Sequence, residues 1–153
     1  MELAKAIKAR DGYPPGGPVD IENFLAPAAE LQAWVAEEDV SVVGHIALHA
    51  SSDYATTRMA SDYLGVPQSD LALIARFFVD PTCRRSGVGR ALLDQATNAA
   101  AERGLHPVLD VATELEPAIA FYESLGWQRA GRVVLDVWDE PPIAMYVYVA
   151  PRQ

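Results

Sequence analysis

The stretch that decides the fold runs from Leu71 to Leu93 and reads LALIARFFVDPTCRRSGVGRALL. Its first part, Leu71–Val79, is apolar at nearly every position, which is typical of a strand buried on both faces of a sheet. A proline ends that strand, and a basic loop with Gly87 and Gly89 leads into an amphipathic helix that Gly104 terminates. The stretch therefore predicts a central strand, a loop and a helix in direct succession.

The loop and the start of the helix suit an anion. The first N–H groups of a helix lack partners within the helix and lie at the positive end of its dipole, and glycines let the backbone approach a ligand closely. Three of the 12 basic residues, Arg84, Arg85 and Arg90, gather here in a chain whose net charge is -9. Neither the Gly-x-x-x-x-Gly-Lys-Ser/Thr loop nor the Gly-x-Gly-x-x-Gly loop of nucleotide-binding proteins is present. We therefore expect a local site for a small anion, with a solvated arginine-rich turn as the alternative.

The rest of the chain supplies further strands and helices around this centre. Ala4–Arg10 can form a helix, and no convincing strand precedes Trp34. The order of elements predicts an α/β fold, a mixed sheet flanked by helices, in which Leu71–Val79 and the following strand form a parallel pair. The other expected elements are the strands Trp34–Ala36, Val40–Leu48, Val108–Ala112, Arg132–Trp138 and Ile143–Val149, and a helix over Pro117–Ser124.

Composition limits the protein class. A chain of 153 residues matches one domain, so we expect residues 1–153 to form a single domain. An excess of 21 acidic over 12 basic side chains repels nucleic acid and anionic membrane, and no apolar run is long enough to cross a bilayer. The single cysteine, Cys83, cannot form an internal disulfide, and the first ten residues lack the apolar run of a secretory signal. These features predict a cytoplasmic protein that binds neither nucleic acid nor membrane.

Two motifs resemble those of the GNAT N-acetyltransferase superfamily. Arg84–Gly89, which reads RRSGVG after a strand ending in Val79-Asp-Pro, is similar to the coenzyme A motif of that family. Ala118–Trp127, which reads AIAFYESLGW, is similar to its later motif, and the two lie in the family's order over Leu71–Arg129. The resemblance implies a GNAT-like, mostly antiparallel sheet of about six strands, here with the first strand missing. It also implies acetyl-CoA as co-substrate and no metal.

The resemblance further implies which residues contact acetyl-CoA. Backbone groups at the end of the central strand would hold the pantetheine arm, and the amides of the loop would wrap the pyrophosphate. The hydroxyl of Tyr122 would face the coenzyme sulfur, where a phenol of pKa ~10 can stabilise a leaving thiolate of pKa ~8.5 by hydrogen bonding. Simple packing of Tyr122 on an apolar helix face is the alternative. The residues assigned to the coenzyme are Phe78, Val79, Arg84, Arg85, Ser86, Gly87, Val88, Gly89, Arg90, Ala118 and Phe121.

The implied reaction is direct attack of a neutral amine on the thioester carbonyl, with the oxyanion facing a backbone N–H of the central strand. A general base must take the amine proton, and the sequence does not identify it. Arg76 can bind an acceptor carboxylate or pair with an acidic neighbour. Leu115 departs from the family, which often has an Asn there that contacts the pantetheine. The candidate bases are Glu114, His45, His49 and Asp53.

The leading hypothesis is an acetyl-CoA-dependent N-acetyltransferase acting on the amine of a small molecule or a peptide. A non-catalytic acyl-CoA-binding or regulatory module of the same fold is the second, because of the unidentified base and Leu115. A protein-interaction domain whose Arg84–Arg90 loop binds another anion is the third. A missing first strand would leave a sheet edge open, and a homodimer that covers it is a further hypothesis.

Overall fold

The computed structural model describes residues 6–10, 30–51, 55–83, 87–136 and 141–152. Contacts group the chain into two compact units, and each is described by itself. The first unit is made from Met1–Ala50 and Ile74–Arg103, and the second from Ser51–Leu73 and Gly104–Gln153. Strand β4 (Leu71–Val79) contributes its beginning to the second unit and its longer remainder to the first.

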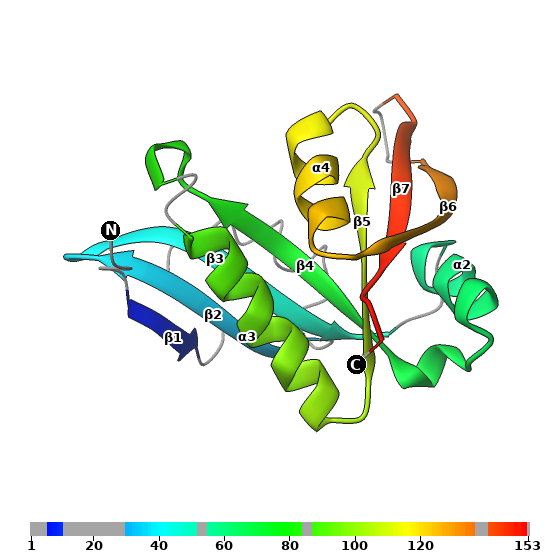
Figure 1. The fold of residues 1–153 in the computed structure, drawn as a ribbon, viewed down its shortest axis with the longest axis horizontal. Coiled ribbons are helices and arrows are strands. Elements are labelled where there is room, and N and C mark those ends of the chain that lie inside the picture. Colours follow the sequence, from blue (N-terminus) through cyan, green and yellow to red (C-terminus); the bar gives the residue numbers. More distant parts are fainter. Residues whose placement is uncertain (1–5, 11–29, 52–54, 84–86, 137–140, 153) are drawn as a thin grey trace. The chain divides into compact units, whose positions relative to one another are not determined.

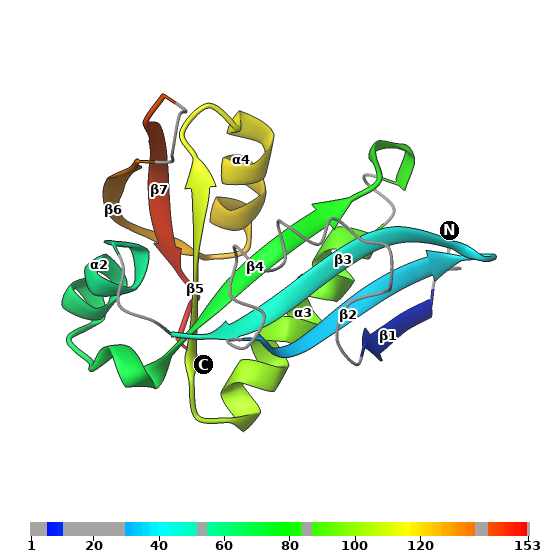
Figure 2. The same cartoon turned by 180° about the vertical axis from the view of Figure 1, so that it is seen from behind.

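The first unit is a sheet with one long helix on its face. The strands follow one another in the order β1-β2-β3-β4, and both β1–β2 and β2–β3 are antiparallel. Helix α3 lies along β2 and β3 (Figure 1), and Figure 2 shows the opposite face of these strands. The elements are β1 (Ala6–Arg10), β2 (Glu30–Glu38), β3 (Ser41–Ala50), a short 3-10 turn (Pro81–Cys83) and α3 (Val88–Glu102).

Gly44 explains how closely α3 approaches the sheet. A Cβ added at Gly44 would lie 2.8 Å from Cδ1 of Leu92 and 3.1 Å from Cγ1 of Val88, closer than packed side chains allow. Both of these helix residues are fully buried. The glycine therefore lets the beginning of α3 pack directly on β3.

The expectations of a helix over Ala4–Arg10 and of a missing first strand were wrong. Residues Ala6–Arg10 form β1, which pairs with β2 from Ala6 opposite Glu37 to Arg10 opposite Ala33. The described part of the chain thus has a seven-stranded sheet, in which β1 is the strand that was expected to be missing. A five-residue edge strand depends on a distant partner, here from Arg10 opposite Ala33 to Ala6 opposite Glu37, so local sequence preference does not reveal it.

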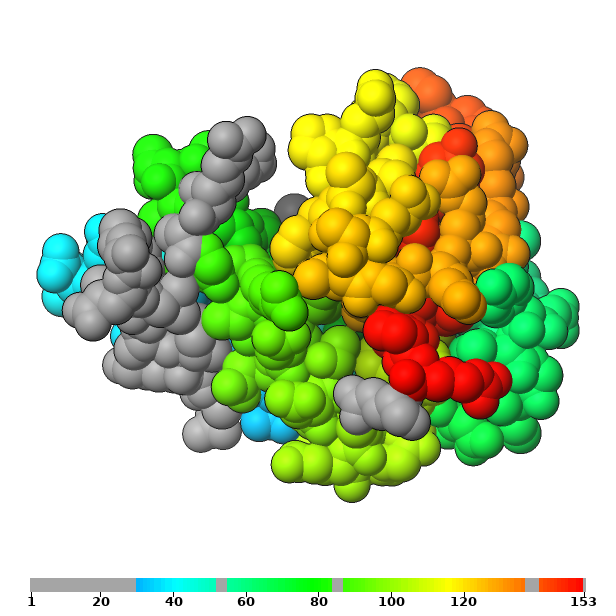
Figure 3. Space-filling model, in the orientation of Figure 1, coloured from blue at the N-terminus to red at the C-terminus, as the bar shows by residue number. Residues whose placement is uncertain are grey.

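The second unit is a four-stranded arrangement in the order β4-β5-β7-β6 with helices against it. The beginning of β4 pairs with β5 in parallel, from Leu71 opposite His106 to Leu73 opposite Val108, and the other pairs are antiparallel. In the space-filling view, α4 and β6 cover much of this unit's visible face (Figure 3). The elements are α2 (Ala55–Leu64), a 3-10 turn (Gln68–Asp70), β5 (His106–Ala112), α4 (Glu116–Ser124), β6 (Gln128–Leu135) and β7 (Ile143–Val149).

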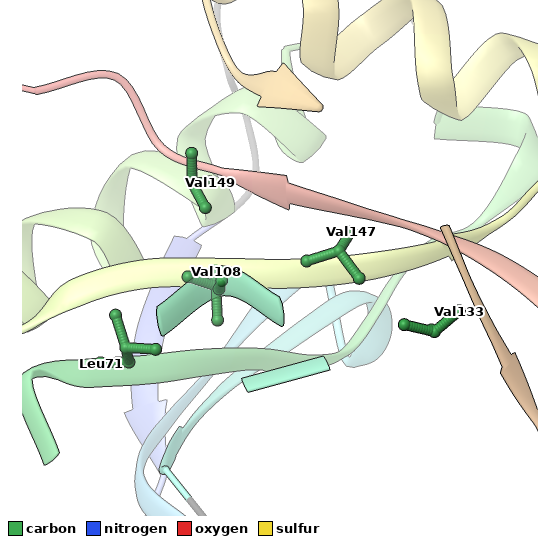
Figure 4. Close-up of a cluster of buried hydrophobic side chains, with 6 residues drawn as sticks. Leu71, Val108, Val133, Val147 and Val149 are labelled. Atoms are coloured by element: carbon green, nitrogen blue, oxygen red, sulfur yellow. The ribbon is translucent and has the colours of Figure 1, made fainter. Parts of the chain in front are cut away.

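Helix α2 closes the core of the second unit. It contributes Ala60 to a buried apolar cluster whose other members come from all four strands (Figure 4). The side-chain end of Met59 packs against Gly131 of β6, where an added Cβ would force Met59 to move. Burial of this surface removes apolar area from water and holds α2 on the sheet. The other residues of the cluster are Leu71, Val108, Val133, Val147 and Val149.

The mixed α/β architecture and the main strands and helices agree with the sequence-based predictions. One feature of β4 differs: Leu71 and Ile74 are buried, whereas Phe78 is 54% exposed. The central strand is therefore buried on both faces only in its first half. No helix in the described ranges is long and apolar enough to cross a membrane.

Candidate functional site

The start of α3 has the geometry of an anion site. Gly87 is the N-cap residue and has a φ of +88°, a left-handed conformation that glycine adopts without strain. It provides no side-chain cap for the first N–H groups of the helix. The side chain of Arg90, in the first turn, is exposed. Backbone donors and a cation therefore lie together at this helix start.

The predicted anion loop is only partly described. Gly87 is the N-cap and Val88, Gly89 and Arg90 form the first turn of α3, so the helix begins two residues earlier than the expected start at Arg90. Residues 84–86 lie outside the described part of the chain, so the roles of Arg84, Arg85 and Ser86 stay predictions.

The end of β4 lies against this helix start. A Cβ added at Gly89 would lie 3.4 Å from Cγ2 of Val79 and 3.8 Å from Phe77, which is ordinary contact distance. After the strand, the Asp80 carboxylate accepts hydrogen bonds from the hydroxyl and the backbone N–H of Thr82, at 2.7 and 2.9 Å. These bonds lower the pKa of Asp80 and close the turn that leads away from the strand. The strand end and the helix start thus form one local structure in the first unit.

Tyr122 lies on α4 in the second unit and is 8% exposed. Its ring lies 5.9 Å from that of Trp127 and 6.2 Å from that of Tyr148, measured between centroids. Burial, and then the charge of Asp110, raise the pKa of Tyr122 to about 12. The phenol therefore keeps its proton at neutral pH, the protonation state in which a hydroxyl can donate a hydrogen bond. Ala118 and Phe121, the other assigned residues of α4, are partly buried.

Asp110 is the functional candidate that the sequence reasoning missed. It lies in β5, and its Oδ2 accepts a hydrogen bond of 2.6 Å from the hydroxyl of Thr56, a fully buried residue of α2. Burial raises the pKa of Asp110, and the Thr56 bond opposes this rise. A partly desolvated carboxylate of raised pKa is a stronger base than an exposed one. The sequence feature that could have indicated this candidate is the presence of an acidic residue, Asp110, within the otherwise apolar strand Val108–Ala112.

A polar cluster fixes α4 against β6 and β7 next to Tyr122. The hydroxyl of Tyr148 donates a hydrogen bond of 2.6 Å to Glu123, the residue after Tyr122. Arg129 donates to that hydroxyl at 3.1 Å and pairs with Glu123 at 3.2 Å. Its guanidinium also lies 3.8 Å from the centre of the Tyr146 ring. These contacts hold the helix segment that carries Tyr122.

The four candidate bases named from the sequence have different surroundings. Glu114 is exposed just after β5, and Asp53 lies outside the described residues. His45 and His49 lie on β3 of the first unit and are 4% and 5% exposed. Burial lowers the pKa of His49, while the charge of Glu30 opposes the shift. Within the described segments, no cluster of three or more His, Cys, Asp or Glu side chains suits a metal ion.

Comparison with known proteins assigns the chain to a family. The model of the acetyltransferase (GNAT) family matches residues 4–127. Over 106 residues, 69% of the chain, the sequence is 32% identical to N-acetyltransferase 8 of Homo sapiens. Over 62 residues, 40% of the chain, it is 40% identical to the [ribosomal protein bS18]-alanine N-acetyltransferase of Escherichia coli K12. Each match spans only 42% of the relative's own length.

A solved structure has a similar fold. It is that of yncA, a putative acetyltransferase from Salmonella typhimurium with its cofactor acetyl-CoA. The two structures superpose with a TM-score of 0.66 at 17% sequence identity, over 95% of this chain and 92% of the other. At this identity the likeness concerns the fold alone.

Proposed function

The chain belongs to the acetyltransferase (GNAT) family, and we propose that it transfers an acetyl group from acetyl-CoA to the amine of a small molecule or a peptide. The observation that carries the proposal is the uncapped start of α3 directly after β4, at the position of the predicted coenzyme motif. The diphosphate of a coenzyme is an anion that backbone N–H groups at a helix start bind well.

In this proposal the first unit holds the coenzyme mainly through its backbone. The N–H groups over Gly87–Arg90 and the Arg90 side chain bind the pyrophosphate, with Arg84 and Arg85 as further cations. Backbone groups of Phe78 and Val79 bind the pantetheine arm as an additional strand would. The exposure of Phe78, with partly buried residues on either side of it, supports this role, because a strand that binds a ligand must be accessible there.

Tyr122 acts on the leaving group. When the bond between the carbonyl carbon and sulfur breaks, the Tyr122 hydroxyl donates a hydrogen bond to the thiolate. With a phenol pKa of about 12 and a thiol pKa of ~8.5, full proton transfer would be uphill by roughly 5 kcal/mol. Tyr122 therefore stabilises the thiolate by hydrogen bonding and keeps its own proton.

Asp110 is the general base of the proposed reaction. The amine nitrogen attacks the thioester carbonyl, its proton passes to the Asp110 carboxylate directly or through water, and the thiolate leaves. The raised pKa of Asp110, caused by its burial, supports this role because it strengthens the carboxylate as a proton acceptor. This assignment replaces the open choice among the four sequence candidates.

The acceptor is proposed as an amine of a peptide or a small molecule. Support for a peptide comes from the E. coli relative, whose name specifies an alanine of a ribosomal protein. A peptide with a free alanine at its amino end is therefore the first acceptor to test, followed by lysine peptides and small amines. The cytoplasmic location and the homodimer remain predictions, and light scattering at micromolar concentration tests the second.

Two measurements test the function. Calorimetric titration with acetyl-CoA is expected to show binding, and an amine library is expected to contain acceptors that cause acetyl-CoA-dependent release of free thiol. Binding without transfer to any amine would support the non-catalytic acyl-CoA module instead. If the protein binds inorganic phosphate or another anion but shows no binding of acetyl-CoA, that result would favour the interaction domain and overturn the proposal.

A further inference from the structure

Arg76 has an unusual backbone conformation for its place in the fold. It lies inside β4, yet its φ is +51°, in the left-handed region that side-chain-bearing residues rarely adopt. A left-handed residue within a strand disrupts the ladder locally, as in a β-bulge. Such conformations persist only where the surroundings hold them, and they concentrate at functional sites. A specific contact that holds Arg76 is therefore expected.

His45 of the neighbouring strand makes that contact. Its Nδ1 lies 2.8 Å from the carbonyl oxygen of Arg76. A carbonyl only accepts, so Nδ1 carries the proton and donates this bond. His45 is 4% exposed, and its ring stacks on that of Phe78, with 5.6 Å between centroids and 8° between planes. The imidazole is thus fixed by packing as well as by hydrogen bonding.

The segment after Arg76 is held at both ends. At one end the His45 ring binds the Arg76 carbonyl, and at the other the Asp80 N–H donates to the Val43 carbonyl at 2.7 Å. The backbone of Phe77 and Phe78 lies between these two anchors. The directions of the N–H groups in this short segment therefore depend on the conformation at Arg76.

We propose that His45 is a positioning residue: by holding the Arg76 carbonyl, it keeps the left-handed backbone of β4 and directs the following N–H groups toward the thioester carbonyl. This proposal rests on the proposed acetyl transfer. Donors directed at a developing oxyanion accelerate acyl transfer only when they are held in place before reaction. His45 itself does not exchange a proton with the substrate.

Three variants separate this role from simple packing. His45→Leu removes the donor, whereas His45→Asn keeps an amide N–H near the position of Nδ1. Arg76→Gly removes the cost of the left-handed conformation, because glycine adopts it freely. His49→Leu is the matched control, since His49 is equally buried on the same strand and has no hydrogen bond to β4 within the described residues.

We expect His45→Leu to lower kcat about tenfold while the Kd for acetyl-CoA changes less than about threefold. His45→Asn and His49→Leu should both stay within about threefold of the wild-type kcat. In the Arg76→Gly background, His45→Leu should lower kcat less than about threefold. Glycine adopts the left-handed conformation without the hydrogen bond from His45. Amide NMR shifts of Phe77 and Phe78 should move in His45→Leu but not in His49→Leu.

An active protein whose His45→Leu variant keeps full kcat would overturn the proposal, as would an equal loss in both Arg76 backgrounds. If His45→Leu fails to fold, His45→Gln replaces it. The Gln amide lies one bond farther from the backbone than the Asn amide, so it does not place a donor at the position of Nδ1. Wild-type protein that transfers no acetyl group to any amine instead overturns the proposed function, and the catalytic role of His45 with it.

Discussion

The two units contribute to the proposed reaction in different ways. In the first unit the candidate groups are mainly backbone N–H groups, at the start of α3 and along the exposed end of β4. In the second unit they are two side chains, Asp110 and Tyr122, whose pKa values burial raises. Backbone donors follow from the fold itself, whereas the reactivity of a side chain follows from its surroundings.

This difference predicts how each unit responds to substitution. Changes in the second unit should affect the chemical step, because they alter the groups that move or stabilise protons and charge. Changes at the start of α3 should affect coenzyme affinity, because they alter how backbone donors are presented. Asp110→Asn and Tyr122→Phe in the second unit should therefore lower kcat, whereas Gly87→Ala in the first should raise the Kd for acetyl-CoA.

The largest effect is expected from Asp110→Asn. An amide cannot take the amine proton, so kcat should fall about 100-fold or more, while acetyl-CoA affinity changes little. The control is Asp62→Asn, an exposed carboxylate on α2, which should leave kcat unchanged. Steady-state thiol release and calorimetry measure the two quantities. An Asp110→Asn variant with wild-type kcat would falsify the assignment of the base.

The same variant should also stabilise the protein at neutral pH. The raised pKa means that the folded state binds the Asp110 proton more tightly than the unfolded chain does. Stability from this group therefore falls as pH rises above the usual value of 3.8. Asn removes that loss, so Tm should be higher than wild type at pH 7 and equal to it below pH 3.8. If Asp110→Asn has a lower Tm than wild type at pH 7, the inference that burial of the charged Asp110 carboxylate destabilises the folded protein is wrong.

Tyr122→Phe should have the second largest effect. It removes the donor to the thiolate and retains the packed ring, so kcat should fall about tenfold with little change in acetyl-CoA affinity. Tyr148→Phe is the matched control, because it removes a neighbouring hydroxyl that binds Glu123 instead. Because the Tyr148 hydroxyl helps to hold α4, its loss can lower kcat by loosening that helix alone. A Tyr122→Phe variant with wild-type kcat, and not the ratio of the two losses, would therefore contradict the role on the leaving group.

Gly87→Ala should weaken coenzyme binding and leave the chemical step nearly intact. Alanine is strained at a φ of +88°, so the start of α3 should distort and the Kd for acetyl-CoA should rise about fivefold. Gly104→Ala is the control, because Gly104 has a similar φ of +72° at the other end of α3 and no neighbour for the added Cβ. A similar rise in Kd in both variants would point to general loss of stability.

Local sequence patterns were sufficient to predict the elements whose structure depends mainly on neighbouring residues. The apolar run of β4, the β-rich composition of β7 and the glycine that ends α3 predicted these elements. Strand β1 was missed because its pairing with β2 depends on distant residues. Asp110 was absent from the candidate bases for the same kind of reason, since its partner Thr56 is 54 positions away. Sequence motifs thus pointed to the start of α3 and to Tyr122, but not to a carboxylate whose environment depends on a distant residue.

Thr56→Val should give the smallest effect. It tests whether the Thr56 hydroxyl controls the pKa of Asp110, the proposed base. The Thr56 hydroxyl stabilises the Asp110 carboxylate and holds its pKa below the value that burial alone would give. Without it, the pKa should rise further, and the acid limb of the kcat/KM profile should move to higher pH. Activity should therefore drop about two- to threefold on the acid limb and recover at higher pH. Thr57→Val is the control, because Thr57 is equally buried and donates to Gln68 at 3.1 Å, and its acid limb should not move. An unchanged profile in Thr56→Val would mean that the Asp110 carboxylate does not govern that limb.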